Sequence, residues 1–374
     1  MNIQHPLLKN IDINSINNID IAVDKIRQLG LMCKIHDDII IVKYPKDLQF
    51  SDKDYILKSR GIIIDFTNKK IINHSVEGCI DYAKFKSKFN WNNIVIEERL
   101  DGTLINVYFN KKWCVSTKFC INADEARFRN NKTFRQLFDL VAPNIYNSLD
   151  KSYTYSFLLQ HTDSRNVSQV NRNKLYHLES TNNVTGEKVQ ITLPNTETPQ
   201  ILKFGQYDLL NKLSVNSYEE LEKIVGNMNW QKAGVMLYTQ DRQYRSKLSS
   251  PNFERVHKLI KDQANINYII IDSMYNKKNL PELLRYYPEF SKNAVDINTK
   301  LSNYTIKLHE LYIKCKVKNT FCKLEKKYKK PLCDLHNLYK TAKGNGNNKY
   351  KITYNIACDL IRNYDSAYIH SLLF

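Results

Sequence analysis

Glu98-Arg99-Leu100-Asp101-Gly102-Thr103 is a polar stretch between two segments that have the pattern of β-strands. Residues 91–96 before it end in β-branched side chains, and residues 104–109 after it alternate with period two. Because an Asp-Gly pair is typical of a hairpin turn, the stretch alone predicts two strands joined by a turn. The function of this stretch depends on which other residues lie near Arg99 and Asp101 in the folded chain.

Strand-like and helical segments alternate on both sides of this turn. Residues 16–29 have apolar side chains at helical spacing and are followed by Gly30, which predicts a helix. Further strands are predicted at 34–44, 59–65, 69–72, 113–119, 152–159, 174–180, 232–238 and 244–248, and helices at 122–140 and 217–225. From about residue 253 onward the pattern is helical and rich in lysine and tyrosine.

The composition indicates which partners the protein favours. The chain has 374 residues and a formal net charge of +18, which favours nucleic acid first and an acidic membrane second. No apolar run reaches the roughly 18 residues of a membrane span, and the first residues lack a signal-peptide pattern, so we expect no membrane association. The eight cysteines are scattered, without a Cys-x-x-Cys pair, which fits a reduced, cytoplasmic compartment.

The central stretch resembles the lysine-x-aspartate-glycine signature of the covalent nucleotidyltransferases, the family of ATP-dependent RNA and DNA ligases and mRNA capping enzymes. In that family the lysine attacks the α-phosphate of a nucleotide and carries AMP or GMP as a phosphoramidate. Arg99 takes the place of this lysine. A nucleophilic amine must lose its proton, whereas a guanidinium stays charged, so it binds phosphate well but attacks it poorly.

Further segments resemble family motifs in the family order, including an Arg-Gly before an apolar strand, as in phage RNA-repair ligases, and a closing Lys-x-Lys motif. The resemblance implies contacts with nucleotide or phosphate at seven positions: Arg60, Gly102, Lys118, Arg165, Tyr176, Arg245 and Lys247. Tyr176 matches an aromatic residue that stacks on the base, and a role as a core residue is the alternative.

Two acidic positions of the family motifs carry apolar residues in this chain. The glutamate of the third motif falls on Leu158, and that of the fourth falls on Ala233. In the family these carboxylates contact metal or ribose, and a hard cation needs oxygen ligands, so we expect no metal site and no cofactor. Asp101 and Arg99 are assigned to the catalytic positions, and the alternative role of Asp101 is a turn residue paired with a nearby base.

The resemblance covers about residues 20–260 and implies an α+β nucleotidyltransferase (adenylation) domain with central antiparallel sheets. We expect this domain at 1–250, with a helix–strand extension at 1–45, and a basic, all-helical domain at 251–374. Residues 314–330 contain a dense lysine run. Such a run predicts either a solvated helix face or a contact with an RNA backbone.

Three functions are consistent with these patterns. The first is a catalytically inactive RNA-ligase-like protein that binds RNA or nucleotide phosphate in a basic pocket, as a subunit or scaffold of an RNA-processing or viral assembly in the cytoplasm, a virion or a viral factory. The second is an active ATP-dependent RNA ligase that uses ATP and Mg²⁺ with an unrecognised nucleophile, or a variant of one inactivated by a lysine-to-arginine change. The third is a purely structural protein that has lost nucleotide binding.

Overall fold

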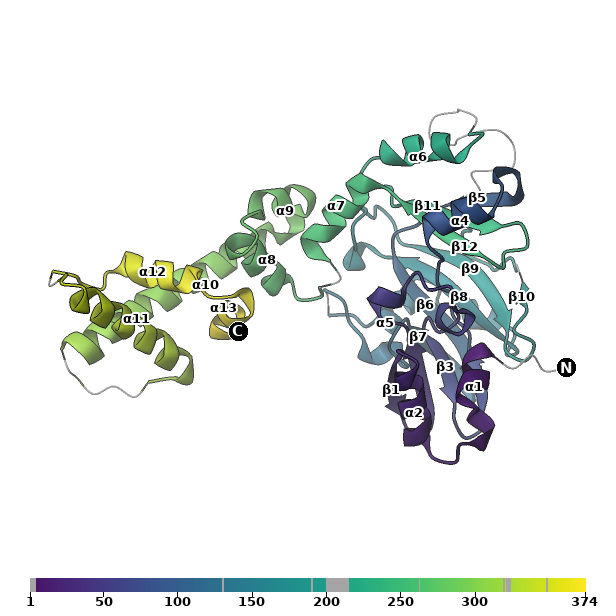
Figure 1. The fold of residues 1–374 in the computed structure, drawn as a ribbon, viewed down its shortest axis with the longest axis horizontal. Coiled ribbons are helices and arrows are strands. Elements are labelled where there is room, and N and C mark those ends of the chain that lie inside the picture. The colour runs from purple at the N-terminus through teal and green to yellow at the C-terminus, as the bar shows by residue number, and fades with distance from the viewer. Residues whose placement is uncertain are drawn as a thin grey trace. The chain divides into compact units, whose positions relative to one another are not determined.

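The computed structural model describes residues 5–129, 131–189, 191–199, 215–261, 263–318, 320, 324–347 and 349–374. The chain divides into two compact units, Met1–His257 and Lys258–Phe374, with the boundary inside helix α7 (Pro251–Ile260). Three antiparallel sheets lie in the first unit, and the described part of the second unit contains helices and no strand (Figure 1). The fold class is therefore α+β, as predicted.

A four-stranded sheet occupies the amino-terminal part of the first unit. Its order is β1 (Met32–His36), β2 (Ile39–Lys43), β3 (Ile62–Asp65) and β4 (Lys70–Asn73), and its helices are α1 (Pro6–Ile11), α2 (Ile19–Gln28) and α3 (Asp54–Leu57). The helices share a core with one face of the sheet, and Tyr108 packs against the other face. The predicted single strand at 34–44 is wrong, because Asp37 adopts a φ of 51° and the chain turns there into a hairpin.

A five-stranded sheet forms the middle of the first unit. Its order is β10 (Lys188–Val189), β9 (Lys174–Asn182), β8 (Tyr153–Gln160), β6 (Thr103–Asn110) and β7 (Lys112–Thr117). Helix α5 (Phe134–Val141) shares an apolar core with this sheet. The helix predicted at 122–140 is shorter in the structure, because the side chains of Thr133 and Gln136 form a capping box that starts it.

A three-stranded sheet completes the first unit, in the order β12 (Arg245–Ser249), β11 (Gly234–Thr239) and β5 (Ile94–Glu98). Its apolar core is shared with α4 (Tyr82–Lys88) and α6 (Tyr218–Gly226). Strand β5 pairs with β11, whereas β6 pairs with β7 and β8. The predicted hairpin is therefore wrong: each strand finds its hydrogen bonds in a different sheet, and residues 99–102 carry the chain from one sheet to the other.

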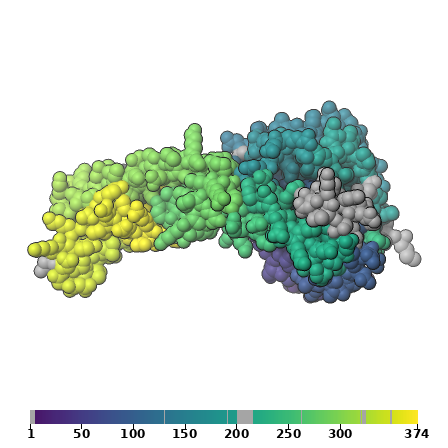
Figure 2. Space-filling view, turned by 90° about the horizontal axis from the view of Figure 1, so that it is seen from above, coloured from purple at the N-terminus to yellow at the C-terminus, as the bar shows by residue number. Residues whose placement is uncertain are grey.

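The second unit is built on two long helices. Its helices after α7 are α8 (Ile266–Tyr275), α9 (Leu280–Tyr286), α10 (Ser291–Tyr312), α11 (Lys326–Gly344), α12 (Tyr354–Arg362) and α13 (Ser366–Leu373). Figure 2 shows the carboxyl-terminal residues in yellow against the light green surface of the long helices, and α12 contacts both α10 and α11. Within the described residues, we find no helix with the length and apolar character of a membrane span.

His5 and His74 make the first unit sensitive to acid. Their ring centroids lie 6.0 Å apart. Burial lowers the pKa of His5 to about 3, with His74 and Lys58 adding to the effect, and burial likewise lowers the pKa of His74 to about 4. Below about pH 6.5 the unfolded chain therefore binds more protons at these sites than the folded chain does, so stability falls as the pH falls.

When the pH is lowered from about 7 to about 5, the free energy of unfolding should decrease less in His5→Asn than in the wild type. We expect the two decreases to differ by up to about 2 kcal/mol. Asparagine retains a cap, because His5 Nδ1 accepts the Leu7 N–H at 3.2 Å and an asparagine oxygen can do the same. Urea unfolding across this pH range measures the difference, with His36→Asn at an exposed site as the control. An unchanged pH dependence in His5→Asn would contradict the prediction.

Candidate functional site

Arg99 lies directly after β5 and is held by three elements of the first unit. Its Nη1 donates to the carbonyl of Ala233 at 3.1 Å and to Ser249 Oγ at 2.6 Å, and it lies 3.3 Å from Glu254 Oε1. Its backbone N–H donates to the carbonyl of Gly234 at 3.0 Å. The guanidinium therefore joins the turn to β11, β12 and α7, and a carboxylate neutralises its charge.

The Glu254 carboxylate carries a negative charge in the folded protein. A hydrogen bond from His257, followed by the charge of Arg99 and hydrogen bonds from Arg99 and Ser249, lowers its pKa to about 2 despite partial burial. The carboxylate is therefore ionised at any ordinary pH. The sequence analysis missed Glu254 because it lies 155 residues from Arg99 and belongs to no motif.

We expect Arg99→Ala to lower the free energy of unfolding by about 1–3 kcal/mol, because Glu254 then loses a charge-assisted partner in a partly buried site. Urea denaturation measures this loss. Glu254→Gln and the double variant complete a thermodynamic cycle, and coupling near zero between the two sites would contradict a role for the ion pair. Arg27→Ala, in an exposed ion pair, is the matched control.

Leu158 packs against the glycine of the central turn. A Cβ atom on Gly102 would lie 2.6 Å from Leu158 Cδ2 and 2.7 Å from the carbonyl of Leu159, so only glycine fits there. Leu158 is also paired across the sheet with Leu104. The structure thus brings Leu158 to the turn that Arg99 joins to Ala233.

Asp101 anchors a loop. Its Oδ2 accepts the backbone N–H groups of Val167 and Ser168, both at 2.8 Å, and its carbonyl accepts Gln160 Nε2 at 2.7 Å. The side chain of Asp101 therefore binds backbone amides, where the sequence suggested a basic residue. Arg165 lies in this loop, and its Nε and Nη2 donate to the carbonyl of Val167 at 3.0 and 2.9 Å.

Three of the predicted phosphate-binding residues, Arg60, Lys118 and Arg245, lie near Tyr44, and Lys247 lies near Arg60. We call these four residues the basic cluster. Charges on Arg60 and Arg245 act on the Tyr44 hydroxyl, and Lys118 Nζ lies 5.8 Å from the Tyr44 ring centroid. The positive charge of Arg60 contributes to lowering the pKa of Lys247, so these two side chains lie near each other.

The Arg60-Gly61 pair directly precedes β3, and the backbone conformation of Gly61 shows why a glycine is needed there. Gly61 has a φ of +85°, and a Cβ atom there would lie 2.9 Å from the carbonyl of Lys118. A glycine therefore lets the two backbones approach and places Arg60 beside the segment that carries Lys118.

Arg245 is the most buried member of the basic cluster. Its side chain is on β12, the residue is only 6% exposed, and its Nε donates to the carbonyl of Gly78 at 3.1 Å. Its Nη2 is buried and has no hydrogen-bond partner among the described residues. A buried guanidinium N–H without an acceptor is costly, and the negative charges of Glu179 and Glu77 stabilise the charged form of Arg245.

Lys247 lies two residues further along β12. Burial lowers the pKa of its ammonium, and the nearby positive charges of Arg99 and Arg60 lower it further. A lysine in such a site loses its proton more readily and gains most from a bound anion. The sequence analysis predicted Lys247 as a phosphate contact but did not predict this perturbation, which arises only when distant basic residues meet.

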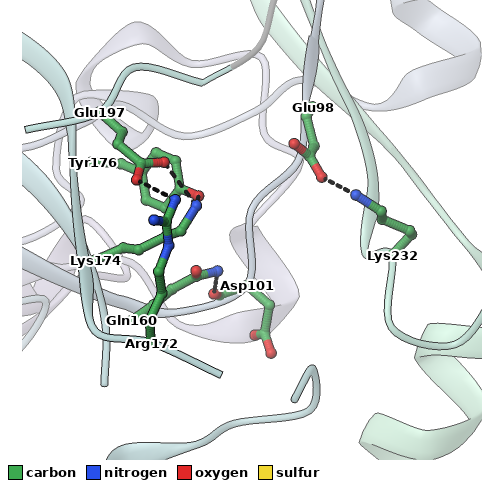
Figure 3. A network of polar contacts seen from close by, with 8 residues as sticks. All are labelled: Glu98, Asp101, Gln160, Arg172, Lys174, Tyr176, Glu197 and Lys232. Atoms are coloured by element: carbon green, nitrogen blue, oxygen red, sulfur yellow. Dashed lines mark hydrogen bonds and ion pairs between the residues drawn. The ribbon is translucent and has the colours of Figure 1, made fainter. Parts of the chain in front are cut away.

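Tyr176 belongs to a second polar network on the same domain (Figure 3). The residue is 8% exposed, and its hydroxyl accepts Lys174 Nζ at 3.2 Å. Lys174 also pairs with Glu197 at 2.8 Å, while Glu98 pairs with Lys232 at 2.7 Å. Sequence reasoning missed these pairs, although Glu98 and Lys232 directly precede the motif positions 99 and 233 and could have been considered with them.

The described residues near the central turn do not supply a donor set for a divalent cation. The described residues contain no group of three or more His, Cys, Asp or Glu side chains arranged to hold a metal ion. Near the central turn, Glu98 is paired with Lys232 and Glu254 with Arg99. Leu158 and Ala233 supply no oxygen from their side chains, so these residues do not fit Mg²⁺.

The fold and the turn together define a class of protein. Antiparallel sheets with the x-Asp-Gly turn crossing between them, and basic residues on the closing strand, correspond to the nucleotidyltransferase architecture that the sequence predicts. The comparisons with known proteins show which members of this class the chain is similar to.

The chain is 26% identical over 205 residues to an RNA ligase of Rhodothermus phage RM378, covering 45% of this chain and 47% of that protein. It is 24% identical over 139 residues to the immediate-early protein ICP-46 homolog of Invertebrate iridescent virus 3, covering 32% and 31%. The chain thus matches about half or less of the length of these curated relatives. The resemblance to the RNA-ligase nucleotidyltransferase family is confirmed by the similarity to the phage enzyme.

Among solved structures, an archaeal ATP-dependent RNA ligase aligns with a TM-score of 0.44 and 11% identity, covering 72% of this chain and 68% of that one. Because this TM-score is below 0.5, the assignment rests on the sequence similarity. No family model matches the chain.

Proposed function

We propose that this protein is a catalytically inactive RNA-ligase-like protein that binds the phosphate of an RNA end or a nucleotide at the basic cluster. The observation that carries the proposal is the set of contacts made by Arg99 at the nucleophile position: two hydrogen bonds and an ion pair with Glu254. A side chain held in this way serves the structure rather than the chemistry of group transfer.

Nucleotidyl transfer requires groups that this site lacks. A neutral amine must attack the α-phosphorus while the bond to pyrophosphate breaks, and cations must offset the charge of the triphosphate. Arg99 stays protonated, and Leu158 and Ala233 cannot hold a metal ion. The residues that would carry the chemistry are therefore replaced, as the sequence predicts.

The groups that bind an anion remain. Arg245 Nη2 has no hydrogen-bond partner among the described residues, and Lys247 is partly buried near Arg99 and Arg60. A phosphate oxygen would satisfy the first and stabilise the charge of the second through charge-assisted hydrogen bonds. The basic cluster therefore supports phosphate binding without a metal.

An RNA partner accounts for the charge of the whole chain. Residues 258–374 contain 21 lysine and arginine residues against 10 aspartate and glutamate residues. Such a surplus favours contact with a phosphate backbone. We propose a role as a subunit or scaffold in a viral or RNA-processing assembly. Six of the described cysteines are free thiols, which supports a cytoplasmic setting: Cys33, Cys79, Cys114, Cys120, Cys333 and Cys358.

Fluorescence anisotropy with a labelled RNA oligonucleotide tests this function. We expect the full chain to bind the 5′-phosphorylated form more tightly than the 5′-hydroxyl form, with an affinity that falls steeply as salt rises. Equal affinity for both ends would remove the terminal phosphate from the proposal. A weak and salt-independent interaction with both would favour the purely structural protein.

A second candidate is an active nucleotidyltransferase whose nucleophile is Lys247. The lowered pKa of this amine beside Arg99 is the observation that favours it. Its Nζ would lose a proton and form a bond to the α-phosphorus of ATP as pyrophosphate leaves. Incubation with α-labelled ATP and Mg²⁺, followed by a denaturing gel and peptide mapping, distinguishes the candidates: an acid-labile label on Lys247 would establish this one and overturn the inactive assignment.

A further inference from the structure

A cavity of about 930 Å³ lies in the first unit, and none of the residues of the basic cluster lines it. One side is formed by the start of α1, by β4 and by the segment after β4. The other side is formed by the end of β9, the turn that follows it and β10, which lies near α1 in Figure 1. This volume is within the range of small-molecule sites, about 300–1,000 Å³.

The inner wall of the cavity is apolar and aromatic. Leu8 and Ile71 contribute buried side chains, and the partly exposed rings of His5 and His74 lie next to each other. The hydrogen bond from the Leu7 N–H to His5 Nδ1 fixes the orientation of that ring. Desolvation lowers the pKa of both imidazoles, so the two rings that line the cavity are uncharged near neutral pH.

The remaining wall is basic and polar. Four lysines line the cavity against two glutamates: Lys58, Lys69, Lys70 and Lys188 against Glu77 and Glu187. Lys188 pairs with Glu77 at 2.9 Å, and Lys69 Nζ donates to the carbonyl of Ile16 at 2.5 Å. Lys58 is partly exposed and pairs with Asp54 at 3.3 Å, so the cavity carries a small positive excess to which the exposed Lys70 contributes.

We propose that this cavity is a second nucleotide-binding site, separate from the basic cluster, that takes one mononucleotide unit either free or at the end of an RNA. The base lies against the His5 and His74 wall, and the phosphate lies among the lysines. A flat, uncharged ring linked to a phosphate matches both walls. A fatty acyl chain does not, because polar side chains of Thr181, Asn183 and Thr185 interrupt the apolar surface.

Photocrosslinking and calorimetry test the site in the full chain, in a Lys247→Met background that removes the proposed contact at the basic cluster. The probes are 8-azido-AMP, with peptide mapping of the crosslink, and AMP, with measurement of the dissociation constant. The test variant is Lys58→Glu with Lys70→Glu. The control is Lys112→Glu with Lys223→Glu, which changes the net charge equally at exposed positions outside the cavity.

We expect a crosslink within residues 5–8 or 181–188, a loss of AMP affinity of at least about 10-fold in the test variant, and a change of less than about 2-fold in the control. If a 5′-phosphorylated RNA oligonucleotide reduces the crosslink of 8-azido-AMP, the natural ligand is an RNA end. If AMP reduces the crosslink and the oligonucleotide does not, the ligand is a free nucleotide. Absence of AMP binding in the Lys247→Met background, or equal affinity in the test and control variants, overturns the proposal. Neither result bears on RNA binding at the basic cluster, which is measured with Lys247 intact.

Discussion

Lys247→Met will weaken binding of a 5′-phosphorylated RNA oligonucleotide by about 10- to 100-fold. A charge-assisted hydrogen bond contributes about 1.5–3 kcal/mol, and each 1.4 kcal/mol is tenfold in affinity. Methionine has a similar length and suits a buried position, so the fold should tolerate it. The loss should appear with the phosphorylated RNA and be much smaller with the 5′-hydroxyl form.

Fluorescence anisotropy at fixed salt measures this effect, with Lys223→Met on an exposed face of α6 as the control. The control should change both affinities by less than about 2-fold, as expected for a screened surface charge. If Lys247→Met binds both oligonucleotides like the wild type, the basic cluster is not the phosphate site.

Arg99→Lys will not produce a nucleotidyl adduct. The substitution restores an amine at the nucleophile position, but Leu158 and Ala233 still provide no ligand for the metal that the reaction needs. The new ammonium would also face Glu254, which stabilises its protonated form and makes it a poor nucleophile. Both effects act in the same direction, so we expect no label above background.

The measurement uses α-labelled ATP with Mg²⁺ and a denaturing gel, and circular dichroism establishes that the variant is folded. The combination of Arg99→Lys with Leu158→Glu should also remain unlabelled, because Ala233 still replaces the second carboxylate. Full labelling of the single variant would show that positions 158 and 233 are not needed for metal binding.

Local patterns predicted the parts of the fold that depend on neighbouring residues. Strand character around Ile62 and Ile96 is visible because apolar and β-branched residues are adjacent in sequence. The helix beginning at Thr133 was predicted too early, since apolar residues such as Phe128 extend the helical spacing beyond the capping box. The crossing of the chain between sheets at 99–102 could not be predicted, because strand partners are chosen by the whole fold.

The same limit applies to the candidate site. The motif pattern selected Arg99, Leu158 and Ala233, and the structure places all three at one turn. The pattern could not show that Glu254 neutralises Arg99, because a pair separated by 155 residues leaves no trace in one sequence. Nor could it show that Arg245 Nη2 lacks a hydrogen-bond partner in the part of the chain that the structure describes, because burial and partners are properties of the folded chain.

The contacts of Arg99 also bear on how such a protein can evolve. Arg99 Nη1 reaches Ser249, Glu254 and the Ala233 carbonyl at once, and a lysine ammonium would lie one bond closer to the backbone than this atom. A lysine at position 99 would therefore lose some of these contacts and lower the stability of the fold. Selection for a stable fold would favour arginine at this position.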